Sequence, residues 1–267
     1  VQPFLEDRRR CFFDAVGATQ RPDVLCAKLL EGRVGLLIDG TPFALVIPKL
    51  FCENFQTMDD YCFRPAYATL IRWIKYAAFL IATLLPALYL AIALHHPELL
   101  NHTLLLILAE AEENAPISLT AEAIGVLLVY EIIREAGLRL PKAVGGAVSI
   151  VAGLIIGDAA VSSGLISTPM LTVTAIAVIA GFVIPDLAQN ITLLRLAFLL
   201  AGGFWGIFGI SLLGSVVLFH LCSGEICGFP IMAPFSPFYP KGLRDTLTRV
   251  SFRKMQSGNF TVEDYHE

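Results

Sequence analysis

Residues 144–160 read VGGAVSIVAGLIIGDAA, an apolar segment in which every fourth position carries a small residue. That spacing places the small residues on one stripe of a helix, and they are Gly145, Ser149, Gly153 and Gly157. Inside a bilayer, helices associate by close backbone contact along such stripes, because burying apolar surface there gains little. The stripe therefore predicts a helix-packing face in a membrane bundle.

The opposite face of this predicted helix is aliphatic and ends in a carboxylate. Its members are Val148, Val151, Ile155 and Asp158. A ring of such faces, one from each subunit of an oligomer, could line a pore and close it by expelling water. The same face could instead contact lipid while the small residues pack. The spacing by itself allows both interpretations.

The composition favours a membrane protein that attracts cations. Hydrophobic residues make up 56% of the 267 positions, and the mean hydropathy is +0.70. Residues 76–222 hold only four basic side chains against nine acidic ones, although the net charge of the whole chain is only -4. An acidic, lysine-poor membrane region favours cations over anions. No basic patch with interleaved aromatic residues indicates nucleic-acid binding.

The predicted fold is a membrane α-helical bundle of about four to five transmembrane helices that follows the C-terminal part of a soluble α/β or α+β domain. Two apolar strands, at residues 34–38 and 43–47, flank Asp39 and Gly40, a dipeptide typical of a tight hairpin. The predicted domains are three: residues 1–72 (the end of the soluble domain and an amphipathic connector), 73–222 (the transmembrane domain) and 223–267 (a polar, basic cytoplasmic tail).

Two segments leave the number of crossings open. Residues 116–137 have a helical pattern, but three glutamates make a crossing costly unless they face a cavity or a partner. This segment either lies in the interface or crosses with its acidic face inward. Residues 193–222 contain GGFWGIFG, so they form either one long tilted helix or a helix that breaks and re-enters.

Three further glutamates, Glu110, Glu112 and Glu113, crowd within four residues. They are either a solvated loop or, in an oligomer, a ring that attracts cations to a pore mouth. The six cysteines show no CxxC pair and no matching histidine spacing, so we expect no metal site and no cofactor. No nucleophile and base pair stands out, so we expect the protein not to be an enzyme.

Several phrases resemble the A-subunit family of GerA-type spore germination receptors, including its stage V sporulation paralogue, over residues 21–249. The phrases stand in family order: RPDVLCAKLLEGRVGLLIDGTPFALVIP (21–48), LLPALYLA (84–91), HPELL (96–100), EIIREAGLRLPKAVGGAVSIVAGLIIGDAAVSSGLIS (131–167) and APFSPF (233–238). The resemblance implies a multi-pass protein of the inner membrane of the bacterial endospore.

It further implies a homo-oligomer in membrane lipid that works with a transporter-like B subunit and a lipoprotein C subunit. Such an A subunit would form a nutrient-gated channel that releases monovalent cations and triggers germination. The alternative is a non-conducting membrane scaffold that couples the transporter-like subunit to later germination machinery. A secondary transporter is a weaker alternative, because the chain shows no internal repeat with paired broken helices.

Overall fold

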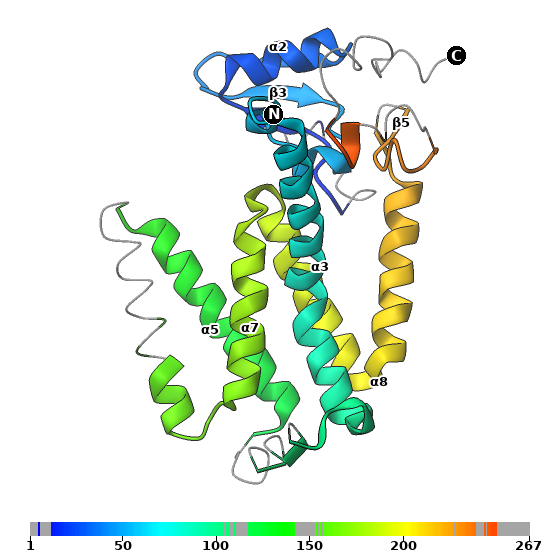
Figure 1. Ribbon diagram of the computed structural model, residues 1–267. Helices are drawn as coiled ribbons and strands as arrows, with labels where there is room; N and C mark the ends of the chain where they lie inside the picture. The colour runs from blue at the N-terminus through cyan, green and yellow to red at the C-terminus, as the bar shows by residue number, and fades with distance from the viewer. Residues whose placement is uncertain are drawn as a thin grey trace. The chain divides into compact units, whose positions relative to one another are not determined.

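The computed structural model divides the chain into two compact units (Figure 1). The first contains Val1–Ala77 and Ser215–Glu267, and the second contains Ala78–Gly214. The structure describes these residues: 5, 12–103, 105–106, 109–110, 117–141, 153, 155, 157–226, 228–238, 243 and 245–249.

A three-stranded antiparallel sheet is the framework of the first unit. Its strands, in spatial order, are β1 (Gly17–Thr19), β3 (Ala44–Ile47) and β2 (Val34–Leu37). In β3 the consecutive residues Ala44, Leu45 and Val46 are all buried, so both faces of the central strand are covered. The prediction of two strands around Asp39 and Gly40 is confirmed, because β2 pairs with β3 and Gly40 takes a φ of 81°.

Short helices and the C-terminal part complete the first unit. These elements are α2 (Pro22–Leu30), η1 (Phe51–Phe55), η2 (Met58–Tyr61), β4 (Glu225–Ile226) and β5 (Phe229–Pro230). The Phe51 amide donates a hydrogen bond to the Ile231 carbonyl at 3.0 Å, which joins η1 to the segment after β5. Next to it Cys52 is buried, and burial raises the pKa of its thiol to about 12. The Cys52 thiol therefore stays protonated at neutral pH.

Helix α3 (Pro65–His95) is 31 residues long and covers the start of the predicted transmembrane domain at residue 73. Small residues along it, among them Ala82, Ala87 and Ala91, are fully buried, which lets neighbouring helices approach closely. Pro86 lies inside this helix. By length and composition α3 is one of two described helical segments that are able to cross a membrane.

The second such segment, Pro185–Ser223, contains the short helix η4 (Pro185–Leu187) and α8 (Ala188–Ser223). Helix α8 breaks at Gly206, whose φ of 61° and ψ of -146° are not helical. The chain then folds back, since a side chain at Gly202 would meet Ile210 at 3.3 Å, a contact that a straight helix excludes (Figure 1). Of the two paths left open for residues 193–222, the broken helix is correct.

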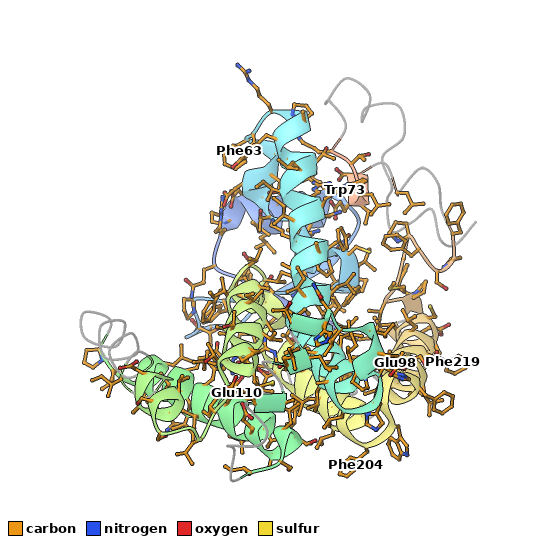
Figure 2. All side chains as sticks on the ribbon, turned by 60° about the horizontal axis from the view of Figure 1, so that its bottom comes forward. Phe63, Trp73, Glu98, Glu110, Phe204 and Phe219 are labelled. Carbon is orange, nitrogen blue, oxygen red and sulfur yellow. The ribbon has the colours of Figure 1, made fainter. Side chains whose placement is uncertain are left out.

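Large apolar side chains cover the outside of α8. Phe204 and Phe219 are 69% and 76% exposed, and Figure 2 shows both rings projecting away from the helix. Trp205 and Phe208, on either side of the break, are similarly exposed. A helix that is apolar on its outer surface is typical of an environment of lipid or of other helices rather than water.

The prediction of four to five membrane spans following a soluble α/β or α+β domain is wrong, because the described residues contain only two helical segments that qualify. Helix α5 (Leu119–Arg139) carries five charged side chains. Helix α7 (Thr168–Phe182) is apolar but only 15 residues long, or about 22 Å at 1.5 Å per residue, which is short of a hydrocarbon core of about 30 Å. Most of residues 144–160 lie outside the described residues.

We predict that Gly206→Ala destabilises the protein by about 3 kcal/mol, because its backbone conformation strains any L side chain. An added methyl group would also lie 2.9 Å from Cγ of His95. Thermal unfolding of the full-length protein in detergent measures the loss. Gly125→Ala in α5 is the matched control, since nothing lies within 4 Å of its position, and it should be neutral or slightly stabilising. Equal losses of stability in the two variants would contradict the prediction that the backbone conformation at Gly206 requires glycine.

Candidate functional site

The structure describes only part of the predicted pore helix. Val148, Val151, Gly145 and Ser149 lie outside the described residues, as do Glu112 and Glu113. Ile155 is 59% exposed, and Asp158 is also exposed. Glu110 is exposed as well (Figure 2). The pore-lining, packing and cation-attracting roles of all these residues therefore stay predictions.

The end of this segment is attached to α7. Residues 157–162 are helical, and a side chain added at Gly157 would meet Cδ2 of Leu171 in α7 at 3.8 Å. Only the turn at residues 163–166 separates this helical end from Ser167, the N-cap of α7. The position of residues 157–162 thus depends directly on how the N-terminus of α7 is held.

Glu122 of α5 holds that N-terminus. Its carboxylate is buried, and one oxygen accepts hydrogen bonds from the Ser167 amide at 2.6 Å and from the Ser167 hydroxyl at 2.7 Å. The first turn of a helix carries unpaired amides and a positive dipole end, which favour an anion. The contact satisfies the buried carboxylate and fixes α5 to the start of α7 at the same time.

Arg195 of α8 lies at the other end of α7. Its guanidinium is buried. It donates from Nε to the Ala82 carbonyl of α3 at 2.7 Å and from Nη2 to the Ala177 carbonyl of α7 at 3.1 Å. A cation near the last turn of a helix is stabilised by the negative end of the dipole. Since α7 has no charged side chain of its own, its two ends are complemented by charges from α5 and α8. We call Glu122 and Arg195 the α7 clamp.

A third polar contact joins α5 to α8 one turn away from Arg195. Glu131 and Arg134 form an ion pair at 2.8 Å, and the Thr192 hydroxyl donates to Glu131 at 2.9 Å. Around these contacts four helices share one apolar cluster, which includes Leu90, Leu119, Ala123, Met170 and Leu199. Polar links and apolar packing together join α3, α5, α7 and α8 in the second unit.

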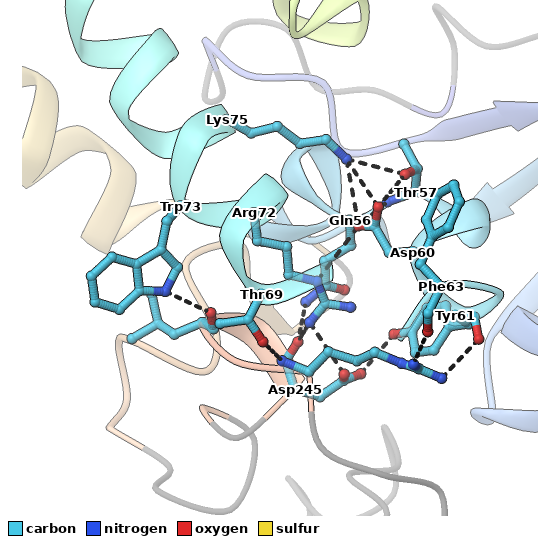
Figure 3. A network of polar contacts seen from close by, with 12 residues as sticks. Gln56, Thr57, Asp60, Tyr61, Phe63, Thr69, Arg72, Trp73, Lys75 and Asp245 are labelled. Atoms are coloured by element: carbon cyan, nitrogen blue, oxygen red, sulfur yellow. Dashed lines mark hydrogen bonds and ion pairs between the residues drawn. The ribbon is translucent and has the colours of Figure 1, made fainter. Parts of the chain in front are cut away.

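The first unit has a polar cluster of its own where α3 begins (Figure 3). Arg72 is completely buried, with Nε 3.5 Å from Asp60 and Nη1 3.2 Å from Asp245. Lys75 adds a second cation 3.4 Å from Asp60, and Tyr61 donates to Asp245 at 2.7 Å. Burial and the Asp245 charge both raise the pKa of Tyr61, so its hydroxyl remains a donor at neutral pH.

Backbone groups of residues 245–249 also bond to the start of α3. Trp73 donates from Nε1 to the Leu247 carbonyl at 3.1 Å, and the Arg249 amide donates to the Thr69 hydroxyl at 3.1 Å (Figure 3). The Arg249 guanidinium donates to the Tyr61 carbonyl at 2.7 Å and to the Phe63 carbonyl. A segment more than 170 positions away in the chain is therefore fixed to the first turns of α3.

The sequence pattern predicts neither the α7 clamp nor the polar cluster at the start of α3. Arg72 and Lys75 flank the start of the predicted transmembrane domain, where cations commonly mark a membrane face. Arg195 is one of the four basic residues in positions 76–222. The usable signal was that Arg195 stands alone within about thirty apolar residues, where an ionisable side chain indicates a buried role. Glu122 gives the same signal, since it is one of the three glutamates that make a crossing by residues 116–137 costly.

These features define a class of helical protein in which two helical segments long and apolar enough to cross a membrane are joined to each other and to a shorter helix by buried polar contacts. The family model described as Bacillus/Clostridium GerA spore germination protein matches residues 1–259. The chain belongs to this family, which confirms the resemblance found in the sequence.

Curated relatives agree. The chain is 40% identical to Spore germination protein KA of Bacillus subtilis over 94% of its own length and 46% of that protein. It is 37% identical to the Uncharacterized membrane protein YfkQ of Bacillus subtilis, covering 96% of the chain and 50% of the relative. It is 34% identical to Spore germination protein GerLA of Bacillus cereus, covering 94% and 51%. The chain thus spans about half the length of these relatives. No solved structure gives a significant match.

We predict that Glu122→Gln destabilises the protein by about 1 kcal/mol, because the amide loses the charge that complements the start of α7 but keeps an acceptor oxygen. Chemical unfolding of the full-length protein in detergent measures the difference. The matched control is Glu135→Gln, which alters an exposed ion pair with Arg139 and should change stability by less than about 0.5 kcal/mol. Similar losses in the two variants would contradict the α7 clamp.

We also predict that Asp245→Ala loosens residues 243–249, because Arg72 and Tyr61 lose an acceptor in a buried cluster. Cleavage of this segment by a dilute protease should accelerate about 30-fold, as expected for a loss of about 2 kcal/mol. Asp39→Ala, at an exposed turn, is the control and should leave the rate within a factor of about two. An unchanged rate for Asp245→Ala would show that the carboxylate does not hold the segment.

Proposed function

We propose that this protein is the A subunit of a spore germinant receptor, which oligomerises in the inner membrane of the endospore into a nutrient-gated cation channel. Family membership supports the germination role, and the name of YfkQ as a membrane protein, with the two long apolar segments, supports the location. The excess of acidic over basic residues in positions 76–222 supports selectivity for cations.

The observation that carries the proposal is the orientation of the described end of residues 144–160. A side chain added at Gly157 would meet α7, whereas Ile155 and Asp158 are exposed, so these two described residues of the aliphatic and acidic face are not buried in their own chain. In an oligomer this face, continued by Val148 and Val151, would meet its copies around a central axis. An aliphatic ring there would stop ions by dewetting until the helices separate.

The partners of the proposed channel are a transporter-like B subunit that binds the nutrient and a lipoprotein C subunit. The chain itself would contribute conduction and gating rather than chemistry. Asp158, Glu110, Glu112 and Glu113 would raise the local concentration of monovalent cations near the pore. In the scaffold alternative these carboxylates would have no effect on ion movement.

We predict that Val148→Ser or Val151→Ser makes dormant spores lose potassium before any nutrient is added, because a hydroxyl ring wets the constriction. The potassium content of purified dormant spores measures the leak. Val216→Ser is the matched control, since it makes the same change at a valine of α8 that is 58% exposed and that the proposal does not assign to the pore. Spores that hold potassium normally in both test variants, with normal receptor levels, would exclude these valines as the gate.

A further inference from the structure

Helix α3 continues through Pro86, which leaves one backbone carbonyl without its usual hydrogen-bond donor. Proline has no amide hydrogen, so the carbonyl four residues earlier, that of Ala82, lacks the backbone hydrogen bond that residue 86 would otherwise donate to it. Ala82 is fully buried, as is Pro86, so water is not at hand to replace the missing donor. A buried carbonyl without a donor is costly.

The hydroxyl group of the next residue, Thr83, does not donate to the Ala82 carbonyl. Thr83 directs its Oγ1 back to the Phe79 carbonyl at 2.8 Å and to the Leu80 carbonyl at 3.3 Å. The donor for Ala82 comes from another helix, because Nε of Arg195 lies 2.7 Å from the Ala82 oxygen. Among the described residues Arg195 forms no ion pair with a carboxylate, so its contacts are those of a hydrogen-bond donor.

We propose that Arg195 replaces the missing amide of Pro86 and thereby locks the first half of α8 to α3 and to the end of α7. The planar guanidinium suits this role, because it presents several donors in a fixed geometry and can serve two carbonyls at once. Moving α8 away from α3 would expose the Ala82 carbonyl without a donor. Within the second unit, the adjoining parts of α3, α7 and α8 therefore move as one body unless this contact is broken.

Close packing around the contact supports the lock. A methyl group added at Gly181 of α7 would lie 3.2 Å from Nη2 of Arg195, so the guanidinium lies close to the last turn of α7. One and two turns further along α8, Leu199 is fully buried, and a side chain at Gly202 would meet the Ala87 carbonyl at 2.8 Å. Helix α8 thus contacts the α3 backbone on both sides of Pro86, at the Ala82 and Ala87 carbonyls. The proposal concerns the fold and does not depend on ion conduction.

A double-mutant cycle in the full-length protein tests the lock. The variants are Arg195→Met, Pro86→Ala and the pair together, and the measurement is the midpoint of thermal unfolding in detergent. Pro86→Ala restores an amide that can bond to Ala82, so the Arg195 donor becomes partly redundant. Arg195→Met alone should lower the midpoint by about 5 °C. In the Pro86→Ala background the same change should cost about half as much, because only the Ala177 bond is lost.

The control is Arg134→Met, which removes an arginine from α5 and should cost the same in both backgrounds. If Arg195→Met alone fails to fold, recovery of a folded protein by adding Pro86→Ala supports the lock, and failure of both overturns it. An equal loss for Arg195→Met in the two backgrounds also overturns it. Arg195→Lys, which keeps the charge but not the fork, should fall between the wild-type protein and Arg195→Met.

Discussion

The second unit depends on how it accommodates two buried charges that are not paired with each other. Glu122 accepts from the cap residue at the start of α7, and Arg195 donates to a carbonyl near its end. An isolated charge is costly in an apolar interior, but the ends of a helix offer partial charges of the opposite sign together with unpaired backbone groups. Helix α7 therefore stabilises both charges, and the charges in turn fix the position of α7.

The fixed position of α7 also affects the segment to which a pore-lining role is proposed. The helical end at residues 157–162 packs on α7 and connects to it through one short turn. In the first unit, Arg72 and Asp245 connect the start of α3 to residues 245–249. The proposed gate would need such fixed connections within each unit, since a gate responds to a distant signal only when the elements between them move together.

Parts of the fold follow from local patterns. The Asp39 and Gly40 turn, the strands beside it and the long apolar helix α3 are set by residues adjacent in sequence. The predicted number of membrane spans is wrong for two reasons. An apolar pattern does not show how long a helix is, as α7 illustrates, and it does not show where the charged residues of a helix lie, as α5 illustrates. Arg195 and Glu122 were not predicted as a clamp, because their acceptors and donors are backbone groups brought close only by the fold. Backbone groups are the same in every residue type, so the sequence carries no signal for a side chain that bonds to them.

The central claim is that the A subunit itself conducts cations when it oligomerises. The most direct measurement is potassium flux from sealed liposomes that contain the purified full-length protein at a known oligomeric state. The proposed channel predicts potassium flux that exceeds chloride flux and that increases when Val151 is replaced by serine. Liposomes that stay sealed to potassium with the wild-type oligomer and with that variant would contradict the channel and favour the scaffold.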